Sequence, residues 1–210
     1  MVRYALISVV FALMIAFASV GHAQAQSTIV VETNNAVVNA DGLCSLREAL
    51  RNVLRGDRTF TDCPDGTNVN EISLDNRTVT ISNGLGNGAG LETIRSSVNV
   101  TISNGTIQRV PNSQLFRLFR VAFDGDLTLT NITLENGGGD GYAGTGAGIF
   151  SEGNLTLNNV TIRNGETDGA GGGIYAITSP GGPNSITLNS VTLDNNIALI
   201  GGGMFANMTP

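Results

Sequence analysis

Apolar and polar residues alternate with a period of two in three similar stretches of the second half of the chain. In the first stretch the apolar row consists of Leu127, Leu129, Ile132 and Leu134. Such alternation is typical of a β-strand with one buried face. The pattern returns at nearly equal steps, in the segments 127–136, 155–164 and 186–195. A repeat with a period of roughly 30 residues predicts an architecture in which successive copies stack on one another.

The alternation slips by one residue in the middle of each copy, at Asn131, Asn159 and Ser190. A one-residue slip would turn every following side chain to the other face of the strand, so we expect a corner there that keeps both halves facing one core. Asparagine tolerates the left-handed backbone conformation that such a corner needs. Each copy therefore predicts two short strands and a corner, and no copy has a helical period.

A glycine run that ends on an aliphatic and an aromatic residue follows each copy and predicts a third strand. These runs are Gly148-Ile149-Phe150, Gly173-Ile174-Tyr175 and Gly203-Met204-Phe205. Together the segments predict an all-β parallel β-helix, in which every strand pairs with its equivalent in the next coil. The outward threonines Thr128, Thr156 and Thr187 should then lie in consecutive layers.

Weaker copies precede these three and extend the predicted solenoid towards the N-terminus. One begins at Val100 and is equivalent to the copy that begins at Leu127, and an earlier one begins at Val79. The unequal steps between copies indicate a constant coil with loops of variable length. The segment 112–123 is richer in aromatic residues than its neighbours. We expect it to take the third-strand position of the coil that begins at Val100.

One amphipathic helix is predicted before the first coil. Ser45 and Glu48 have the spacing of a capping box, and Gly56 is a stop signal. The apolar face contains Leu46, Ala49, Leu50, Val53 and Leu54, and the opposite face contains Arg47, Arg51 and Arg55. An open solenoid end exposes backbone and core, so we expect this helix to cap it. Docking of a partner protein is the alternative.

Residues 1–25 have the pattern of a secretory signal peptide. Arg3 precedes an apolar stretch over residues 5–20, and Ala23-Gln24-Ala25 offers the small residues that a signal peptidase needs. The apolar stretch is short for a membrane span, although an uncleaved anchor is the alternative. We therefore expect a mature chain without a transmembrane span and without its single histidine, His22. The expected location is extracellular or on a bacterial cell surface.

The net charge limits the binding partners that we expect, and the cysteine content limits the kinds of site. With 17 acidic residues against 11 basic ones the net charge is −6, which disfavours nucleic acid and anionic membranes. In a secreted chain the two cysteines, Cys44 and Cys63, most simply form a disulfide. A catalytic thiol would lack an activating histidine or lysine, and a zinc site would lack ligands.

The hexapeptide Cys44-Ser45-Leu46-Arg47-Glu48-Ala49 resembles the motif that names the CSLREA N-terminal domain. The segments 62–66 and 70–74 are similar to the continuation of that domain, so the resemblance covers about residues 28–82. CSLREA domains begin secreted bacterial proteins, many without a demonstrated activity, and the resemblance implies a right-handed parallel β-helix behind an N-terminal cap. The later repeats are similar to those of polymorphic outer membrane proteins and pectate-lyase-like β-helices.

These observations divide the chain into three parts. Residues 1–25 form the signal peptide, 26–82 the CSLREA-type cap with the first coil or coils, and 83–210 the β-helix repeats. No C-terminal cap is evident in the sequence. A bare solenoid end favours association, so we expect the C-terminal edge to pair with further repeats or with another chain.

Two acidic residues form a candidate site. Asp140 and Asp168 each follow a repeat asparagine by four residues and precede a glycine. In register, their carboxylates could bind Ca²⁺, which prefers oxygen ligands, or act as an acid/base pair in glycoside cleavage. Two solvated Asp-Gly turns are the alternative.

Aromatic and basic residues form a second candidate site. Phe150, Tyr175 and Phe205 should stack in one column, either as an exposed ladder for sugar rings or as packing. The arginines near the third strand of the Val100 coil could bind an acidic glycan or form a solvated edge; they are Arg109, Arg117 and Arg120.

The sequence favours a secreted or cell-surface β-helix scaffold for binding or adhesion, with no evident catalytic centre. The expected partner is an extracellular glycan or a surface protein, and Ca²⁺ is the one candidate cofactor. The alternatives are a polysaccharide lyase or glycoside hydrolase, and a glycan- or Ca²⁺-binding module without catalysis.

Overall fold

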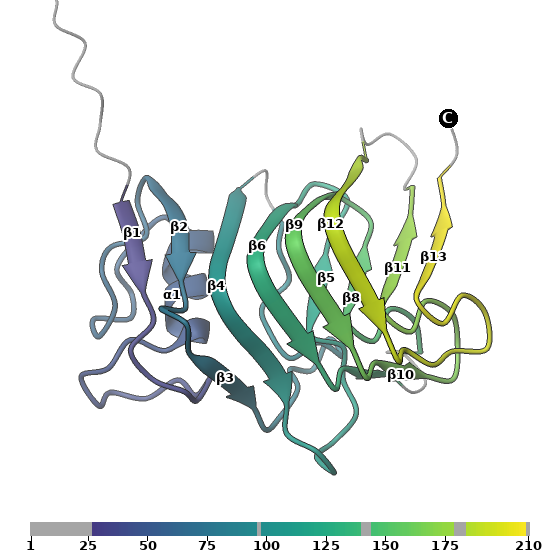
Figure 1. The fold of residues 1–210 in the computed structure, drawn as a ribbon. Coiled ribbons are helices and arrows are strands. Elements are labelled where there is room, and N and C mark those ends of the chain that lie inside the picture. The colour runs from purple at the N-terminus through teal and green to yellow at the C-terminus, as the bar shows by residue number, and fades with distance from the viewer. Residues whose placement is uncertain (1–26, 96–97, 140–143, 179–183, 209–210) are drawn as a thin grey trace, which may run out of the picture.

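The computed structural model describes residues 27–95, 98–139, 144–178 and 184–208. These residues form a right-handed parallel β-helix of about four turns, with one short helix near its N-terminal end (Figure 1). The predicted fold class is therefore confirmed. The predicted signal peptide lies outside the described residues. Within the described ranges, no helix has the length and apolar character to cross a membrane.

Two parallel sheets form the walls of the solenoid, and both bury one face. The long sheet contains β1 (Ser27–Val30), β2 (Val69–Ser73), β3 (Thr78–Ile81), β4 (Asn99–Arg109), β6 (Asp126–Glu135), β9 (Asn154–Arg163) and β12 (Ile186–Asp194). The short sheet contains β5 (Phe119–Val121), β8 (Ile149–Ser151), β11 (Ile174–Ile177) and β13 (Met204–Asn207). A two-stranded sheet of β7 (Gly138–Gly139) and β10 (Glu166–Thr167) connects the walls.

The core is a stack of aliphatic rows held in register. Leu127 pairs with Leu155, which pairs with Ile186 in the next coil, and both leucines are fully buried. The predicted outward row is also confirmed, because Thr128, Thr156 and Thr187 are paired in consecutive layers. Segment 112–123 contains β5, which pairs with β8 and so occupies the predicted third-strand position.

Each corner of the long sheet is made by a single left-handed residue. Asn104, Asn131, Asn159 and Ser190 have φ between 53° and 59°. The amide of Asn131 donates to Asn104 Oδ1 at 3.1 Å, and that of Asn159 donates to Asn131 Oδ1 at 2.9 Å. The strand continues through the corner, so each copy is one bent strand where the sequence predicted two separate strands. One residue is enough to absorb the slip because only its own backbone pairing is interrupted.

The copy predicted to begin at Val79 is in the wrong register. Val79 pairs with Ile107, and the position opposite Ile102 belongs to Ile72 in β2. Val79 is therefore equivalent to Ile107 in the next coil, and its predicted equivalence to Val100 is wrong. The error arose because residues 79–84 and 100–105 have the same sequence, Val-Thr-Ile-Ser-Asn-Gly, although they occupy different halves of the coil.

Helix α1 (Leu46–Arg55) lies beside β1 and β2 at the N-terminal end of the solenoid (Figure 1). Its predicted capping box is present: Ser45 Oγ accepts from the amide of Glu48 at 3.4 Å, and Glu48 Oε2 accepts from the amide of Ser45 at 3.0 Å. Gly56 ends the helix with φ 64°. The apolar face is buried, as a cap requires, with Leu54 partly buried at its margin.

The arginine face of α1 packs against the coil that follows. Arg47 is buried, and its Nε donates to the carbonyl of Gly90 at 3.1 Å. Arg51 forms an ion pair with Glu92, with 2.6 Å between Nε and Oε1. These contacts anchor the cap to the segment 83–92.

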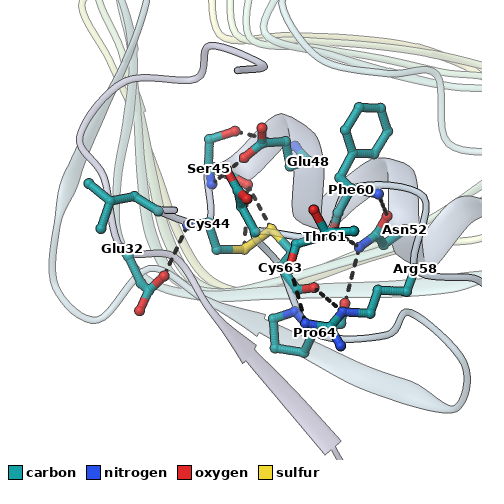
Figure 2. Close-up of a disulfide and its surroundings, with 12 residues drawn as sticks. Glu32, Cys44, Ser45, Glu48, Asn52, Arg58, Phe60, Thr61, Cys63 and Pro64 are labelled. Atoms are coloured by element: carbon teal, nitrogen blue, oxygen red, sulfur yellow. Dashed lines mark hydrogen bonds between the residues drawn. A yellow bond between two sulfur atoms is a disulfide. The ribbon is translucent and has the colours of Figure 1, made fainter. Parts of the chain in front are cut away.

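The predicted disulfide joins Cys44 and Cys63 and is buried (Figure 2). The loop that it closes is also held by Asn52, whose amide donates to the carbonyls of Phe60 at 2.9 Å and Pro64 at 3.1 Å. Asn52 is fully buried, so the disulfide and these hydrogen bonds together hold the segment 57–64 against the helix.

The last described coil leaves apolar side chains exposed at the far end of the solenoid. They include Leu188, Ile197, Leu199 and Ile200, and Leu199 is 82% exposed. Strands β12 and β13 lie at the edges of their sheets. Pairing of this edge with further repeats or with another chain stays a prediction.

Replacement of the corner residue Asn131 should separate conformational strain from hydrogen bonding. Asn131→Ala and Asn131→Gly both lose the asparagine contacts, but only alanine resists positive φ, at a cost of roughly 1–2 kcal/mol. We expect urea unfolding to show Asn131→Ala less stable than Asn131→Gly by that amount. Thr130→Ala is the control and should change the unfolding free energy by less than about 0.5 kcal/mol. Equal stability of the two Asn131 variants would contradict the corner.

Removal of the disulfide should loosen the cap. The double variant Cys44→Ala/Cys63→Ala is expected to lose about 2–5 kcal/mol of unfolding free energy, because the unfolded chain is no longer constrained. Chemical denaturation followed by circular dichroism measures this loss. Wild-type protein under reducing conditions should show a comparable loss, whereas unchanged midpoints in both samples would refute a structural role for the bond.

Candidate functional site

Three aromatic rings stack along the outer face of the short sheet. Phe150, Tyr175 and Phe205 are paired in register in β8, β11 and β13. Ring centroids are 5.5 Å apart between Phe150 and Tyr175 and 5.3 Å apart between Tyr175 and Phe205, with interplanar angles of 12° and 8°. All three side chains are partly exposed. The predicted stacking is thus present, and we call these residues the aromatic column.

The stacking decides which ring surfaces a ligand can reach. Tyr175 has a ring on each side, and Phe150 has a ring on one side and arginine side chains near it. Phe205, in the edge strand β13, stacks with Tyr175 on one side. A sugar stacks on the face of a ring, so Phe205 is the favoured position for such contact. Along the rest of the column the ring edges form an apolar stripe.

Two arginines begin the column on its N-terminal side. Arg120 is paired in register with Phe150, so it occupies the layer before the first ring. The guanidinium carbons of Arg117 and Arg120 lie 4.7 and 5.7 Å from the centroid of the Phe150 ring. These distances allow cation–π attraction, which fixes both guanidinium groups beside the ring.

The positive charge at this end is poorly hydrated. Burial lowers the pKa of Arg117 to about 10; repulsion from Arg120 acts in the same direction, and attraction to Glu152 opposes it. Because this pKa is still well above neutral, Arg117 is cationic at physiological pH. A bound anion would stabilise this buried charge.

The hydrogen-bonding capacity of the Arg120 guanidinium group is only partly used. Its Nη2 lies 3.4 Å from Glu152 Oε2 in a long ion pair. Its Nε is buried and has no hydrogen-bond partner among the described residues. This nitrogen is out of contact with solvent, so a ligand would approach Arg120 through the exposed part of its side chain, which is 38% exposed.

A cavity of about 300 Å³ opens beside these arginines, and we call it the column-side cavity. Its lining combines guanidinium, amide and hydroxyl groups with one aromatic ring. The lining residues are Gly86, Asn87, Arg117, Arg120, Thr145 and Phe150. Such a mixture of hydrogen-bonding groups and apolar surface suits a polar organic ligand.

A second cavity, of about 540 Å³, lies between α1 and the segment 85–95, and we call it the helix-side cavity. Its lining residues are Arg51, Leu54, Arg55, Leu85, Asn87, Glu92, Thr93 and Arg95. Asn87 lines both cavities, and its amide donates to the hydroxyl of Thr93 at 2.7 Å. The two cavities are therefore neighbours that share one side chain.

The predicted acidic pair is not tested by the structure, because Asp140 lies outside the described residues. Asp168 is exposed. In the described part of the chain, no cluster of three or more His, Cys, Asp or Glu side chains could hold a metal ion. The Ca²⁺ site stays a prediction. Arg109 lines neither cavity described above; its guanidinium donates to the carbonyls of Asn136 at 2.7 Å and Ser113 at 2.9 Å.

Sequence reasoning found the column and two of its arginines, but it missed the segment 85–95. This segment pairs with the segment 117–121 of the next coil through isolated parallel bridges, Ala89 with Arg117 and Ile94 with Val121. It has no clear alternation of its own, and only this long-range pairing places Asn87, Thr93 and Arg95 beside the helix.

Comparisons of this chain with protein-family models, with curated proteins and with solved structures give no significant match. The resemblance to the CSLREA domain consequently rests on the hexapeptide at residues 44–49 and its continuation, and it stays a prediction.

Replacement of Phe150 should show how much the contacts of Arg117 and Arg120 with its ring contribute to the free energy of unfolding. Phe150→Leu loses ring stacking, about 0.5–1.5 kcal/mol, and cation–π attraction of about 0.5–2 kcal/mol. The matched variant Phe205→Leu loses stacking alone. In urea unfolding, Phe150→Leu should therefore be the less stable of the two. Equal losses would show that the ring does not stabilise the guanidinium groups.

Proposed function

We propose that this protein is a secreted or cell-surface binding module, with a β-solenoid scaffold that holds an extracellular glycan at the outer face of its short sheet. The observation that carries the proposal is the cavity at the head of the aromatic column, whose lining combines the side chains of Arg120, Asn87 and Thr145 with the ring of Phe150. Sugars offer many hydroxyl oxygens that can accept from such donors.

The scaffold suits binding because it fixes the site in advance. Arg120 and Phe150 lie on paired strands, and the Phe150 ring holds the guanidinium groups in place. A ligand would therefore lose little of its binding energy to ordering the protein. The aromatic column extends the surface away from the cavity, so several sugar units of one chain could contact it.

Export from the cell is part of the proposal. It is supported by the signal-peptide pattern of residues 1–25 and by the Cys44–Cys63 disulfide, a bond that is common in oxidising compartments and rare in reducing ones. We further propose that residues 26–82 form a CSLREA-type cap, on the strength of the hexapeptide and of the capped helix that it begins.

A binding and cleavage assay with the full chain tests this function. We expect at least one polysaccharide from a panel of neutral and acidic polymers to bind in isothermal titration calorimetry, with no new reducing or unsaturated ends released. Arg120→Gln should weaken binding about tenfold, as expected for loss of a charged hydrogen-bond donor.

The matched control is Arg163→Gln, on the outer face of the long sheet, where Arg163 Nε donates to Glu135 Oε1 at 2.8 Å. This variant should bind like the wild type. Release of chain ends would instead identify an enzyme, and absence of binding to every polymer would refute the proposed function.

A further inference from the structure

The two cavities follow one another along the axis of the solenoid. Ile94 is bridged to Val121 of β5, and β5 is paired with β8. The segment 85–95 therefore forms the layer before β5, roughly 4.8 Å away. Helix α1 reaches this layer through the ion pair between Arg51 and Glu92. The order along the axis is helix-side cavity, column-side cavity and aromatic column.

A pair of arginines also lies beside an aromatic ring next to the helix-side cavity, although that ring, Phe60, does not line the cavity itself. Arg51 and Arg55 lie with their guanidinium carbons 5.4 and 5.7 Å from the centroid of the Phe60 ring. Arg117 and Arg120 are placed in the same way around Phe150. The exposed side chain of Arg55 and the partly exposed side chain of Arg120 can donate to a ligand from these positions.

The helix-side cavity has more positive than negative charge. Its lining includes three arginines, and Glu92, which is engaged by Arg51, is the single acid among the described lining residues. Arg55 and Arg95 are exposed, so their charges face solvent. Five of the chain's 11 basic residues line the two cavities, although the net charge of the chain is −6. The positive charge is thus gathered in one place.

We infer that the two cavities form one continuous binding groove for an acidic polysaccharide, a chain of sugars with recurring carboxylates. The inference rests on the proposed function and adds to it the charge and the path of the ligand. The helix-side arginines bind one carboxylate and the column-side arginines bind another. Asn87, between them, contacts the hydroxyl groups of the connecting sugars, and the apolar stripe of the aromatic column follows.

Other polyanions fit this arrangement less well. The overall negative charge of the protein disfavours polyanions in general, so the neutral groups of the ligand must decide between them. A polyuronate spaces its charges by whole sugar units. It also has the hydroxyl groups and apolar ring faces that Asn87, Thr145 and the aromatic column can contact.

The test compares alginate, a polyuronate, with alginate whose carboxylates have been esterified, using calorimetry on the full chain. The variant Arg55→Gln/Arg95→Gln removes two exposed charges of the helix-side cavity. We expect it to weaken alginate binding at least about tenfold and to reduce the dependence of affinity on salt. Arg58→Gln, at a residue that lines neither cavity, is the control and should bind like the wild type.

The outcomes separate this inference from the proposed function. If esterified alginate binds as tightly as alginate, and the double variant binds both normally, the acidic groove is refuted while glycan binding stands. If single-stranded DNA or anionic lipid vesicles bind as tightly as alginate, the groove is a general polyanion site and the inference also fails. If no polysaccharide binds, the proposed function itself fails. Unchanged urea midpoints would show that the variants are folded.

Discussion

Parallel hydrogen bonding in register between successive coils is the constraint on which this structure depends. It brings equivalent residues to roughly the same separation in every layer, so each recurring residue type becomes a row. Leucine and isoleucine form the core, threonine the outer face, and phenylalanine and tyrosine the column. The corner asparagines maintain this register because their left-handed backbone turns the strand without loss of the inward row.

The cap helix serves the same constraint at the end where no earlier coil exists. Its apolar face covers the core, and its arginine face contacts the segment that forms the next layer. Arginine side chains that pack against a coil need hydrogen-bond acceptors there. The carbonyl of Gly90 accepts from Arg47, and the carboxylate of Glu92 pairs with Arg51. The side chains left over, such as Arg55, line a cavity. The same helix therefore closes the solenoid and forms one wall of the candidate site.

The sequence predicted those features that depend on spacing within one repeat or one helix. The corner at Asn131, the third strand at Phe150 and the capping box at Ser45 each have a local signal, because a slip in alternation, a glycine run or a cap motif occupies few residues. The register of Val79 was wrong because an identical hexapeptide occurs in two different halves of the coil. The cavities could not be predicted, since their walls come from α1, the segment 85–95 and β5, which meet only after long-range pairing.

The position of the arginine cavities near the cap has a consequence for how such a protein can change. The unit from β9 to β11 repeats the plan of its neighbours and adds one ring, Tyr175, to the column. Duplication or deletion of such a unit in the gene would lengthen or shorten the apolar stripe by one layer. The charged end and the disulfide-linked helix would remain intact. Gene duplication could thus change the length of the surface that contacts a polymer, while the arginine cavities that determine which polymer binds stay the same.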